Sequence, residues 1–301
     1  MNMQTVPATA AVASINPPAY KRSRGHWANV AARIVRNPLA MTAAIILLAL
    51  IGIAVFAPWI MPADPFATSM FTRLKPIGTP GHLFGTDELG RDLLSRLMLG
   101  GRLSLFMGIT PVLLAFVIGS GIGILAGYAG GFINTAIMRT IDVLYAFPSV
   151  LLAIALSGAL GAGIVNALTS LTIVFIPQIA RIAESVTTQV RRSDYVDAAR
   201  ASGASAFTIV RAHVLGNVLG PIFVYSTSLI SVSMILASGL SFLGLGVKPP
   251  EPEWGLMLNT LRTAIYTQPW VAALPGAFIF ITSISFNMLS DGLRSAMEVK
   301  Q

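Results

Sequence analysis

The stretch LAMTAAIILLALIGIAVFAPWI, from Leu39 to Ile60, carries no charged residue and decides the class of fold. About 20 predominantly apolar residues are enough to cross the roughly 30 Å hydrocarbon layer of a bilayer as a helix. Asn37 is a favourable N-cap and Pro38 suits the first helical position, so both predict where this helix begins. The preceding residues lack the pattern of a signal peptide, and the run is too long for one, so we expect a retained transmembrane helix.

The composition of the whole chain agrees with a membrane protein. Of its 301 residues, 54% are hydrophobic and 11% are charged, and the mean hydropathy is +0.75. A soluble domain usually carries about 25% charged residues. The chain has no cysteine, which excludes disulfides and thiolate metal sites.

A second uncharged run, from Leu103 to Met138, is expected to form the second span. Glycines recur in it at every fourth residue, along one face of a helix. Small residues at this spacing let a neighbouring transmembrane helix approach closely, so the face is predicted to be a packing seam rather than a ligand site. These glycines are Gly119, Gly123, Gly127 and Gly131.

Three later runs complete the count of spans. The uncharged stretch from Val143 to Ala180 would be about 57 Å long as one helix, so we expect two spans there, with a break at Gly158 to Gly163. A fifth span is expected within Val214 to Val247, where a partial second crossing is the alternative, and a sixth within Thr263 to Ser290. The predicted fold class is an all-α integral membrane protein with about six transmembrane helices.

The distribution of Lys and Arg predicts the orientation. With the N-terminus inside, 13 of the 20 Lys and Arg residues fall in cytoplasmic segments and seven in external ones, as the positive-inside rule favours. The N-terminal tail lacks the interleaved aromatic residues of a nucleic-acid platform, so its charge is assigned to membrane orientation and not to nucleic acid. Its basic residues are Lys21, Arg22, Arg24, Arg33 and Arg36. Both termini are expected in the cytoplasm.

This topology divides the chain into five segments. They are a basic cytoplasmic tail at 1–38, the first transmembrane helix at 39–60, an extracytoplasmic segment at 61–102, a membrane core at 103–294 with a cytoplasmic loop at 181–216, and a cytoplasmic tail at 295–301. Within the core, the external connection from Lys248 to Gln268 is interpreted either as an anchor at the interface through Trp254 or as structural punctuation.

The extracytoplasmic segment contains FGTDELGRD, from Phe84 to Asp92. Charges of both signs alternate here, which indicates a locally paired, interfacial element. Its carboxylates are also candidates for binding a cation, but Arg91 and Arg96 lie about one helical turn away and favour salt bridges. The residues singled out are Gly85, Thr86, Asp87, Gly90, Arg91 and Asp92, with Glu88 as a further candidate cation ligand.

The cytoplasmic loop contains DYVDAARASGA, from Asp194 to Ala204. Asp194 is a candidate N-cap for a short helix, and Gly203 is a stop signal. Such a helix has small residues on one side and charges on the other, which suits docking into a groove on a soluble partner. A solvated loop helix without a partner is the alternative.

This loop resembles the EAA loop of binding-protein-dependent ABC importer permeases, through Asp197-Ala198-Ala199 and Gly203. It departs from the family in having Asp for the usual Glu, and Leu215-Gly216 where a Leu-Pro pair is typical. Other motifs are similar to the second-type permease subunit of the dipeptide, oligopeptide and nickel transporters, and the resemblance covers Arg36 to Arg294. They are Gly85-Thr86-Asp87, Gly90-Arg91-Asp92, Ser95-Arg96, Gly101 to Leu105, Leu240 to Gly246, Trp254-Gly255, Phe286-Asn287 and Asp291 to Arg294.

The resemblance implies the type I ABC importer transmembrane fold, in a bacterial inner membrane. It implies a homologous permease subunit, two cytoplasmic ATP-binding subunits and an extracytoplasmic solute-binding protein as partners, besides membrane lipid, and no cofactor. The EAA-like loop is then the element that couples to the ATPases. Asp197 and Arg200 are its expected polar contacts, while Ala198, Ala199 and Gly203 permit close approach.

Two rival functions are an enzyme and a stand-alone transporter or channel. An enzyme is disfavoured because His26, His82 and His213 are isolated, no nucleophile elbow is present, and the absence of a P-loop leaves ATP hydrolysis to another polypeptide. A stand-alone secondary transporter or channel is the alternative, but ion-coupled carriers commonly place ionisable residues at the midplane. Polar residues of the spans either line a passage or bond across helices, so the substrate pathway stays unassigned. They are Ser226, Ser228, Ser231, Ser233, Asn166, Thr169 and Gln178. Dipeptides, longer peptides, glutathione-like compounds and nickel chelates all remain candidate cargoes.

Overall fold

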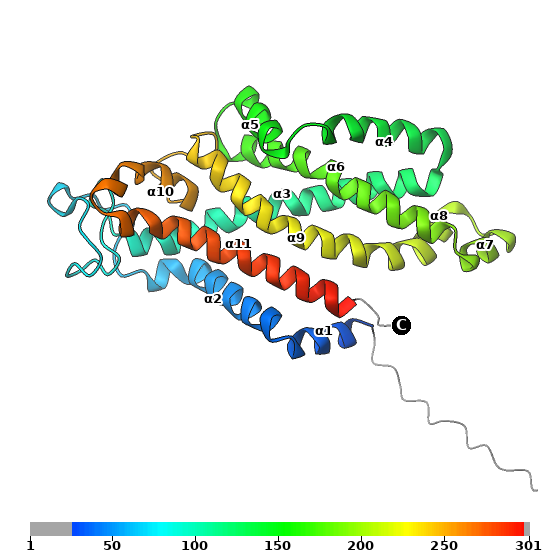
Figure 1. The fold of residues 1–301 in the computed structure, drawn as a ribbon, viewed down its shortest axis with the longest axis horizontal. Helices are drawn as coiled ribbons and strands as arrows, with labels where there is room; N and C mark the ends of the chain where they lie inside the picture. Colours follow the sequence, from blue (N-terminus) through cyan, green and yellow to red (C-terminus); the bar gives the residue numbers. More distant parts are fainter. Residues whose placement is uncertain (1–25, 298–301) are drawn as a thin grey trace, which may run out of the picture.

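The computed structural model describes residues 26–297, which form a long helical bundle without strands (Figure 1). Of the basic residues of the N-terminal tail, Lys21, Arg22 and Arg24 lie outside the described residues. The helices are α1 His26–Arg36, α2 Pro38–Ile60, η1 Met70–Thr72, α3 Leu93–Ala129, α4 Gly131–Tyr145, α5 Ser149–Leu160, α6 Ile164–Arg191, α7 Asp194–Ala201, α8 Ala206–Ile209, η2 Val210–Val214, α9 Leu215–Phe242, α10 Trp254–Thr260, η3 Arg262–Tyr266 and α11 Pro269–Met297.

Helix α2 begins where the sequence predicts. The Asn37 side chain accepts hydrogen bonds from the backbone N–H groups of Leu39 and Ala40, at 3.1 and 3.3 Å, and Pro38 occupies the first turn. These contacts satisfy N–H groups that have no partner inside the helix. The prediction for the start of this helix is confirmed.

Helices α3 and α6 run side by side in the same direction. A Cβ atom added at Gly119 would lie 3.0 Å from the Ile176 carbonyl oxygen, and one at Gly127 would lie 2.7 Å from that of Glu184. Residue numbers at the contacts therefore increase in the same direction along both helices, which makes the two helices parallel. The predicted glycine seam is confirmed for Gly119, Gly123 and Gly127, but it is wrong for Gly131, which begins α4 and has no atom within 4 Å of an added Cβ.

Because α3 and α6 are parallel, the chain between them must return across the bundle. It does so through α4 and α5, which are bent by 87° relative to each other. Five helices of the described part are long and apolar enough to cross a membrane, and this bent pair makes a sixth crossing. The expectation of about six spans is therefore met.

The second and third spans nevertheless begin and end elsewhere than predicted. The run from Leu103 to Met138 is not one helix, because Gly130 and Gly131 adopt positive φ of 66° and 51° and turn the chain. Left-handed backbone ends a helix without any change in hydropathy, so the pattern did not reveal it. The predicted break at Gly158 to Gly163 does coincide with the junction of α5 and α6.

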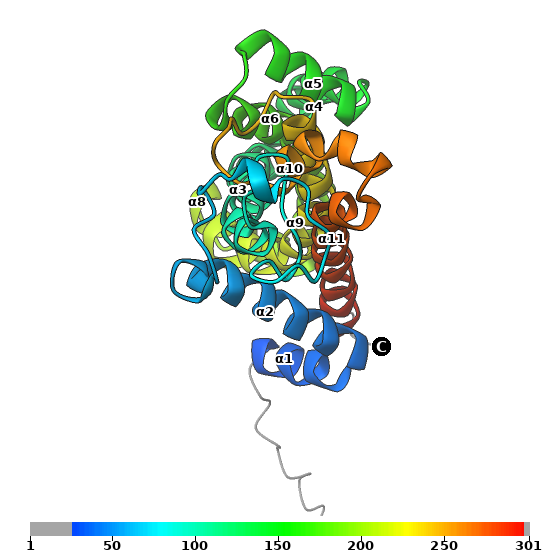
Figure 2. The ribbon, with the colours of Figure 1, turned by 90° about the vertical axis from the view of Figure 1, so that its left-hand side faces the viewer.

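The later spans leave both ends of the described chain at the same end of the bundle. Helix α9 is continuous, so the alternative of a partial second crossing there is not realised. A Cβ atom at Gly292 of α11 would lie 2.4 Å from that of Ala40 in α2, and Arg33 Nη1 donates to the Ala296 carbonyl oxygen at 3.2 Å. Figure 2 shows the bundle end-on, with α3 and α9 near its centre and with α4–α5 and α1–α2 on opposite sides.

A buried hydrogen-bonded cluster of Ser104, Glu253 and Trp254 lies at the end of the bundle that carries residues 61–92. Glu253 caps α10 through the N–H groups of Gly255 and Leu256, and it accepts a hydrogen bond from Ser104 of α3 at 3.1 Å. Ser104 Oγ also accepts from the backbone N–H of Trp254 at 3.0 Å. The connection between α9 and α11 is thereby fastened to α3.

We predict that Ser104→Ala lowers the free energy of unfolding by about 1–3 kcal/mol, because it leaves the buried Glu253 carboxylate and Trp254 N–H short of partners. Ser120 is the matched control, since it is a buried serine of the same helix whose hydroxyl has no hydrogen-bond partner among the described residues. Thermal denaturation of both variants in detergent checks this. Equal melting temperatures for the two variants would show that the hydrogen bonds of Ser104 contribute nothing to stability.

Candidate functional site

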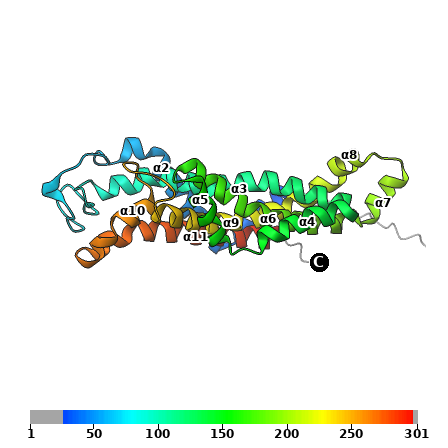
Figure 3. The same ribbon diagram turned by 90° about the horizontal axis from the view of Figure 1, so that it is seen from above.

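Helix α7 forms the heart of the EAA-like loop and stands at the end of the bundle opposite residues 61–92 (Figure 3). Its N-cap position is Ser193, so the prediction of Asp194 as N-cap is wrong by one residue; Asp194 and Asp197 instead lie in the first turn, where they favour the helix dipole. At its other end, the Gly203 N–H donates to the Arg200 carbonyl at 2.9 Å and the Ala204 N–H to that of Ala199 at 3.1 Å. This pair of bonds requires a left-handed residue, and Gly203 has φ +80°.

Helix α7 is mounted on the ends of the long helices. Val196, on the inner side of α7, is fully buried. The Tyr195 hydroxyl accepts a hydrogen bond from Asn217 of α9 at 3.2 Å, and the Arg200 guanidinium lies 5.9 Å from the centroid of the Tyr128 ring in α3. The loop helix is therefore in contact with two membrane-spanning helices as well as with α6, which precedes it.

The outer face of α7 is small and open. Ala198 and Ala201 are exposed, and Asp197 and Arg200 form an exposed ion pair of 3.0 Å with each other. Such a surface pair contributes little to stability, so both groups remain available to a partner. Among the described residues no atom lies within 4 Å of a Cβ added at Gly203, so its role here is the turn. Close approach of another subunit to these residues stays a prediction.

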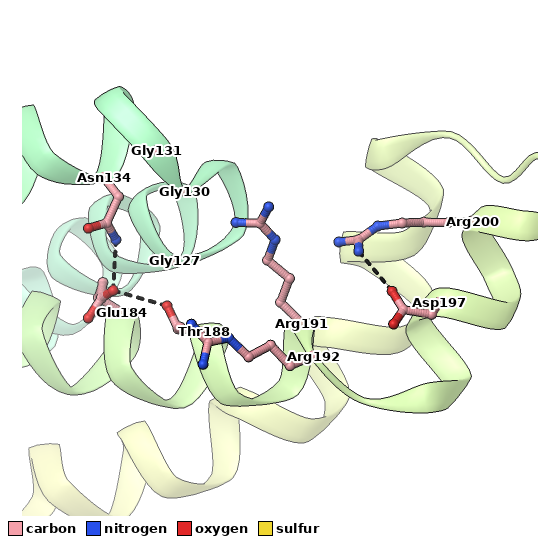
Figure 4. A pocket seen from close by; sticks show the side chains of 10 residues that line it. All are labelled: Gly127, Gly130, Gly131, Asn134, Glu184, Thr188, Arg191, Arg192, Asp197 and Arg200. Atoms are coloured by element: carbon pink, nitrogen blue, oxygen red, sulfur yellow. Dashed lines mark hydrogen bonds and ion pairs between the residues drawn. The ribbon is translucent and has the colours of Figure 1, made fainter.

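A pocket of about 570 Å³, which we call the coupling-end pocket, lies between α7 and the ends of α3, α4 and α6 (Figure 4). Glu184 accepts hydrogen bonds from Asn134 at 2.7 Å and Thr188 at 3.0 Å. This pocket was not predicted, because in the sequence the arginines indicate only the orientation of the chain. The lining residues are Gly127, Gly130, Gly131, Asn134, Glu184, Thr188, Arg191, Arg192, Asp197 and Arg200.

At the opposite end, Asp87 organises the segment from 61 to 92. One of its oxygens accepts the N–H groups of Leu89 and Arg91, both at 2.9 Å, and the other lies 2.6 Å from Arg91 Nε and 3.2 Å from Arg96 Nε. The interpretation as salt bridges is confirmed. Residues 26–297 contain no group of three or more His, Asp or Glu placed to hold a metal ion.

The other residues of this motif also serve the fold. A Cβ atom at Gly85 would lie 2.3 Å from the Lys75 carbonyl oxygen, and one at Gly90 would lie 1.8 Å from that of Ser69. The Thr86 hydroxyl accepts from the Lys75 N–H at 2.9 Å. Asp92 caps α3 through the Ser95 N–H at 2.8 Å and contacts His82, at 3.0 Å, with its other oxygen. The motif builds a compact cap with its polar groups turned inward.

Within this cap, burial and then the neighbouring Asp87 raise the pKa of the Glu88 carboxyl. An acid whose pKa is higher in the folded than in the unfolded state favours folding most at low pH, and that contribution is lost as the pH rises through the folded-state pKa. We therefore predict that Glu88→Gln raises the melting temperature relative to the parent chain at pH 8, and that the difference shrinks toward pH 4. A difference that grows on acidification would contradict this.

The polar side chains of the spans mostly bond within their own segment. Ser226 donates to the Ile222 carbonyl at 2.8 Å, and Thr169 to that of Val165 at 2.8 Å. Two of the seven residues bond to another helix. The Gln178 side chain donates to Ser149 of α5 at 3.2 Å, and the Asn166 side chain donates to the carbonyl of Leu160, the last residue of α5, at 2.8 Å. These bonds assign no substrate pathway.

Comparison with known proteins identifies the family. Residues 119–300 match the family model of the binding-protein-dependent transport system inner membrane component. The chain belongs to this family. Residues 25–76 match the N-terminal transmembrane domain of oligopeptide transport permease C.

Two similar proteins are both named glutathione transport system permease protein GsiD. The protein from Pectobacterium atrosepticum is 41% identical over 93% of this chain and 93% of its own length. That from Escherichia coli O157:H7 is 42% identical over 92% and 91%. Among solved structures, the methionine ABC transporter MetNI in inward-facing conformations matches with a TM-score of 0.56 over 68% of this chain and 97% of the MetNI chain. At 19% identity this likeness shows the fold, that of a type I importer permease.

Proposed function

We propose that this permease subunit forms half of the passage of an importer for a small peptide, and that ATP-binding subunits drive it by docking on α7. The relatives named as glutathione transport permeases make glutathione the first cargo to test. The observation that carries the proposal is the position of α7. This exposed helix contacts the ends of α3 and α9 and follows α6, so a displacement of α7 is transmitted to three long helices.

The orientation follows from the same assignment. An ATPase works in the cytoplasm, so the end with α7 faces the cytoplasm, together with both ends of the described chain. The compact cap at residues 61–92 then faces outward, where a solute-binding protein delivers the cargo. The excess of Lys and Arg on the α7 side supports this orientation in a bacterial inner membrane. A homologous permease subunit supplies the other half of the passage, and ATP hydrolysis belongs to the separate subunits.

Reconstitution in liposomes tests this function. The chain with its partner permease, ATP-binding subunits and solute-binding protein should accumulate labelled glutathione only when ATP is present on the α7 side. Omitting the ATP-binding subunits should abolish accumulation. Accumulation by the chain alone would instead support a stand-alone carrier. If the complete complex hydrolyses ATP but ignores glutathione, a panel of dipeptides and longer peptides identifies the cargo.

A further inference from the structure

Three arginines and two carboxylates line the coupling-end pocket, and two of the arginines, Arg191 and Arg192, form no ion pair with another described residue. Arg200 is paired with Asp197, and Glu184 is engaged by Asn134 and Thr188. Figure 4 shows the Arg191 guanidinium standing between the glycine turn and Arg200. The pocket therefore offers unused N–H donors, and its three arginines outnumber its two carboxylates, so its lining carries a net positive charge.

The backbone on the facing side adds to this positive potential. Helix α4 starts at Gly131, and its N-cap residue, Gly130, supplies no side chain to cap the first N–H groups. An uncapped helix N-terminus favours anions. Arg191 is held against the same turn, since a Cβ atom at Gly130 would lie 2.1 Å from its Nη1 atom. The turn and the guanidinium thus face one pocket.

The depth of the pocket in the membrane indicates the source of the anion. The uncharged part of α3 begins at Leu103, and Gly127 lies about 36 Å further along the helix axis. That distance exceeds the roughly 30 Å of hydrocarbon and falls within the 40–45 Å that includes the headgroups. Next to the glycine turn, Phe132 and Ile133 are 86% and 51% exposed. Apolar side chains beside a basic pocket at headgroup depth match a phospholipid.

We propose that the coupling-end pocket binds the phosphate of an anionic phospholipid, with Arg191 and Arg192 as its charged contacts and Phe132 and Ile133 against the acyl chains. Basic pockets between transmembrane helices are known to take such headgroups. Because Asp197 and Arg200 of α7 line the same pocket, the bound lipid contacts the element assigned to coupling. Only the leaflet, the cytoplasmic one, rests on the proposed function.

Lipid retention on the purified complex tests this proposal. The complex is titrated with phosphatidylglycerol or with zwitterionic phosphatidylcholine, and bound lipid is counted by native mass spectrometry. Loss of one arginine near the surface should weaken phosphatidylglycerol binding about fivefold, and Arg191→Gln with Arg192→Gln about thirtyfold. Arg211→Gln, an exposed arginine of the same end that does not line the pocket, should leave binding unchanged. Exchange of both residues for lysine should restore most of it.

Three results would overturn the proposal. They are equal retention by the double glutamine variant and the parent, equal retention of phosphatidylcholine, and displacement of the lipid by millimolar inorganic phosphate, which would make the pocket a free phosphate site. The measurement requires no transport. If the parent complex binds phosphatidylglycerol but does not take up glutathione, only the proposed function is contradicted. If it takes up glutathione but does not bind phosphatidylglycerol, only this site is contradicted.

Discussion

Gly203→Val is expected to reduce ATP-driven uptake at least tenfold while the chain still inserts and assembles. Gly203 has φ +80°, and the two hydrogen bonds that close α7 depend on this conformation. A side chain in the left-handed region costs roughly 1–2 kcal/mol, and more for a β-branched residue. About 1.4 kcal/mol already corresponds to a factor of ten, so the end of α7 should leave the position in which a partner meets it. Uptake in the reconstituted complex, with co-purification of the partners, is the measurement.

Gly203→Asn distinguishes two causes of lost uptake: loss of the left-handed turn, and a steric clash of a larger side chain with an approaching subunit. Asparagine is a comparatively large residue that tolerates the left-handed region, so this variant should keep most of the uptake. If valine and asparagine both abolish uptake, bulk near an approaching subunit is the cause, as the resemblance alone implies. Unchanged uptake with valine would remove α7 from the coupling path.

Gly123→Leu is expected to prevent correct packing of α3 on α6. An added Cβ alone would lie 2.3 Å from the Ala180 carbonyl oxygen, 2.6 Å from the Ala183 Cβ and 2.9 Å from the Glu184 N. Two of these atoms belong to the backbone of α6, so no side-chain rotation relieves the clash. Overpacking typically costs about 1–3 kcal/mol, and we expect about 3 kcal/mol or more here, with little folded protein recovered.

Gly121→Leu is the matched control. It lies two residues away on the exposed side of α3, and an added Cβ there has no atom within 4 Å. The same substitution should therefore leave the melting temperature and the yield of folded protein close to those of the parent. Similar losses for both variants would mean that leucine is harmful in this helix for a reason other than the seam.

Features encoded locally could be predicted from the sequence. The cap of α2 at Asn37, the seam at Gly119 to Gly127 and the position of α7 depend on residues a few places apart, and their periods or side-chain types reveal them. The turn at Gly130 could not be seen, because hydropathy reports preference for lipid and not the direction of the chain. The bent pair of α4 and α5 follows only once α3 and α6 are known to be parallel.

The candidate site likewise has features that the sequence reveals and features that it does not. The acidic residue, alanines and glycine of α7 stand in a recognisable pattern. Its mounting depends on partners far away in the sequence: Tyr195 meets Asn217, and Arg200 meets Tyr128. The coupling-end pocket likewise joins the turn at Gly130 to Arg191. Such long-range pairs leave no signal in one sequence.

The absence of cysteine allows a direct test of the central claim that α7 is the cytoplasmic contact for an ATP-binding subunit. Ala198→Cys places a single thiol on the exposed face of α7, and Phe71→Cys, at a residue that is 95% exposed, places one on the opposite cap. In intact cells, a membrane-impermeant maleimide should label only the variant at 71, and a short thiol–amine cross-linker should join only the variant at 198 to the ATP-binding subunit. Labelling of the variant at 198 from outside, or its failure to cross-link in an assembled, active complex, would contradict the account.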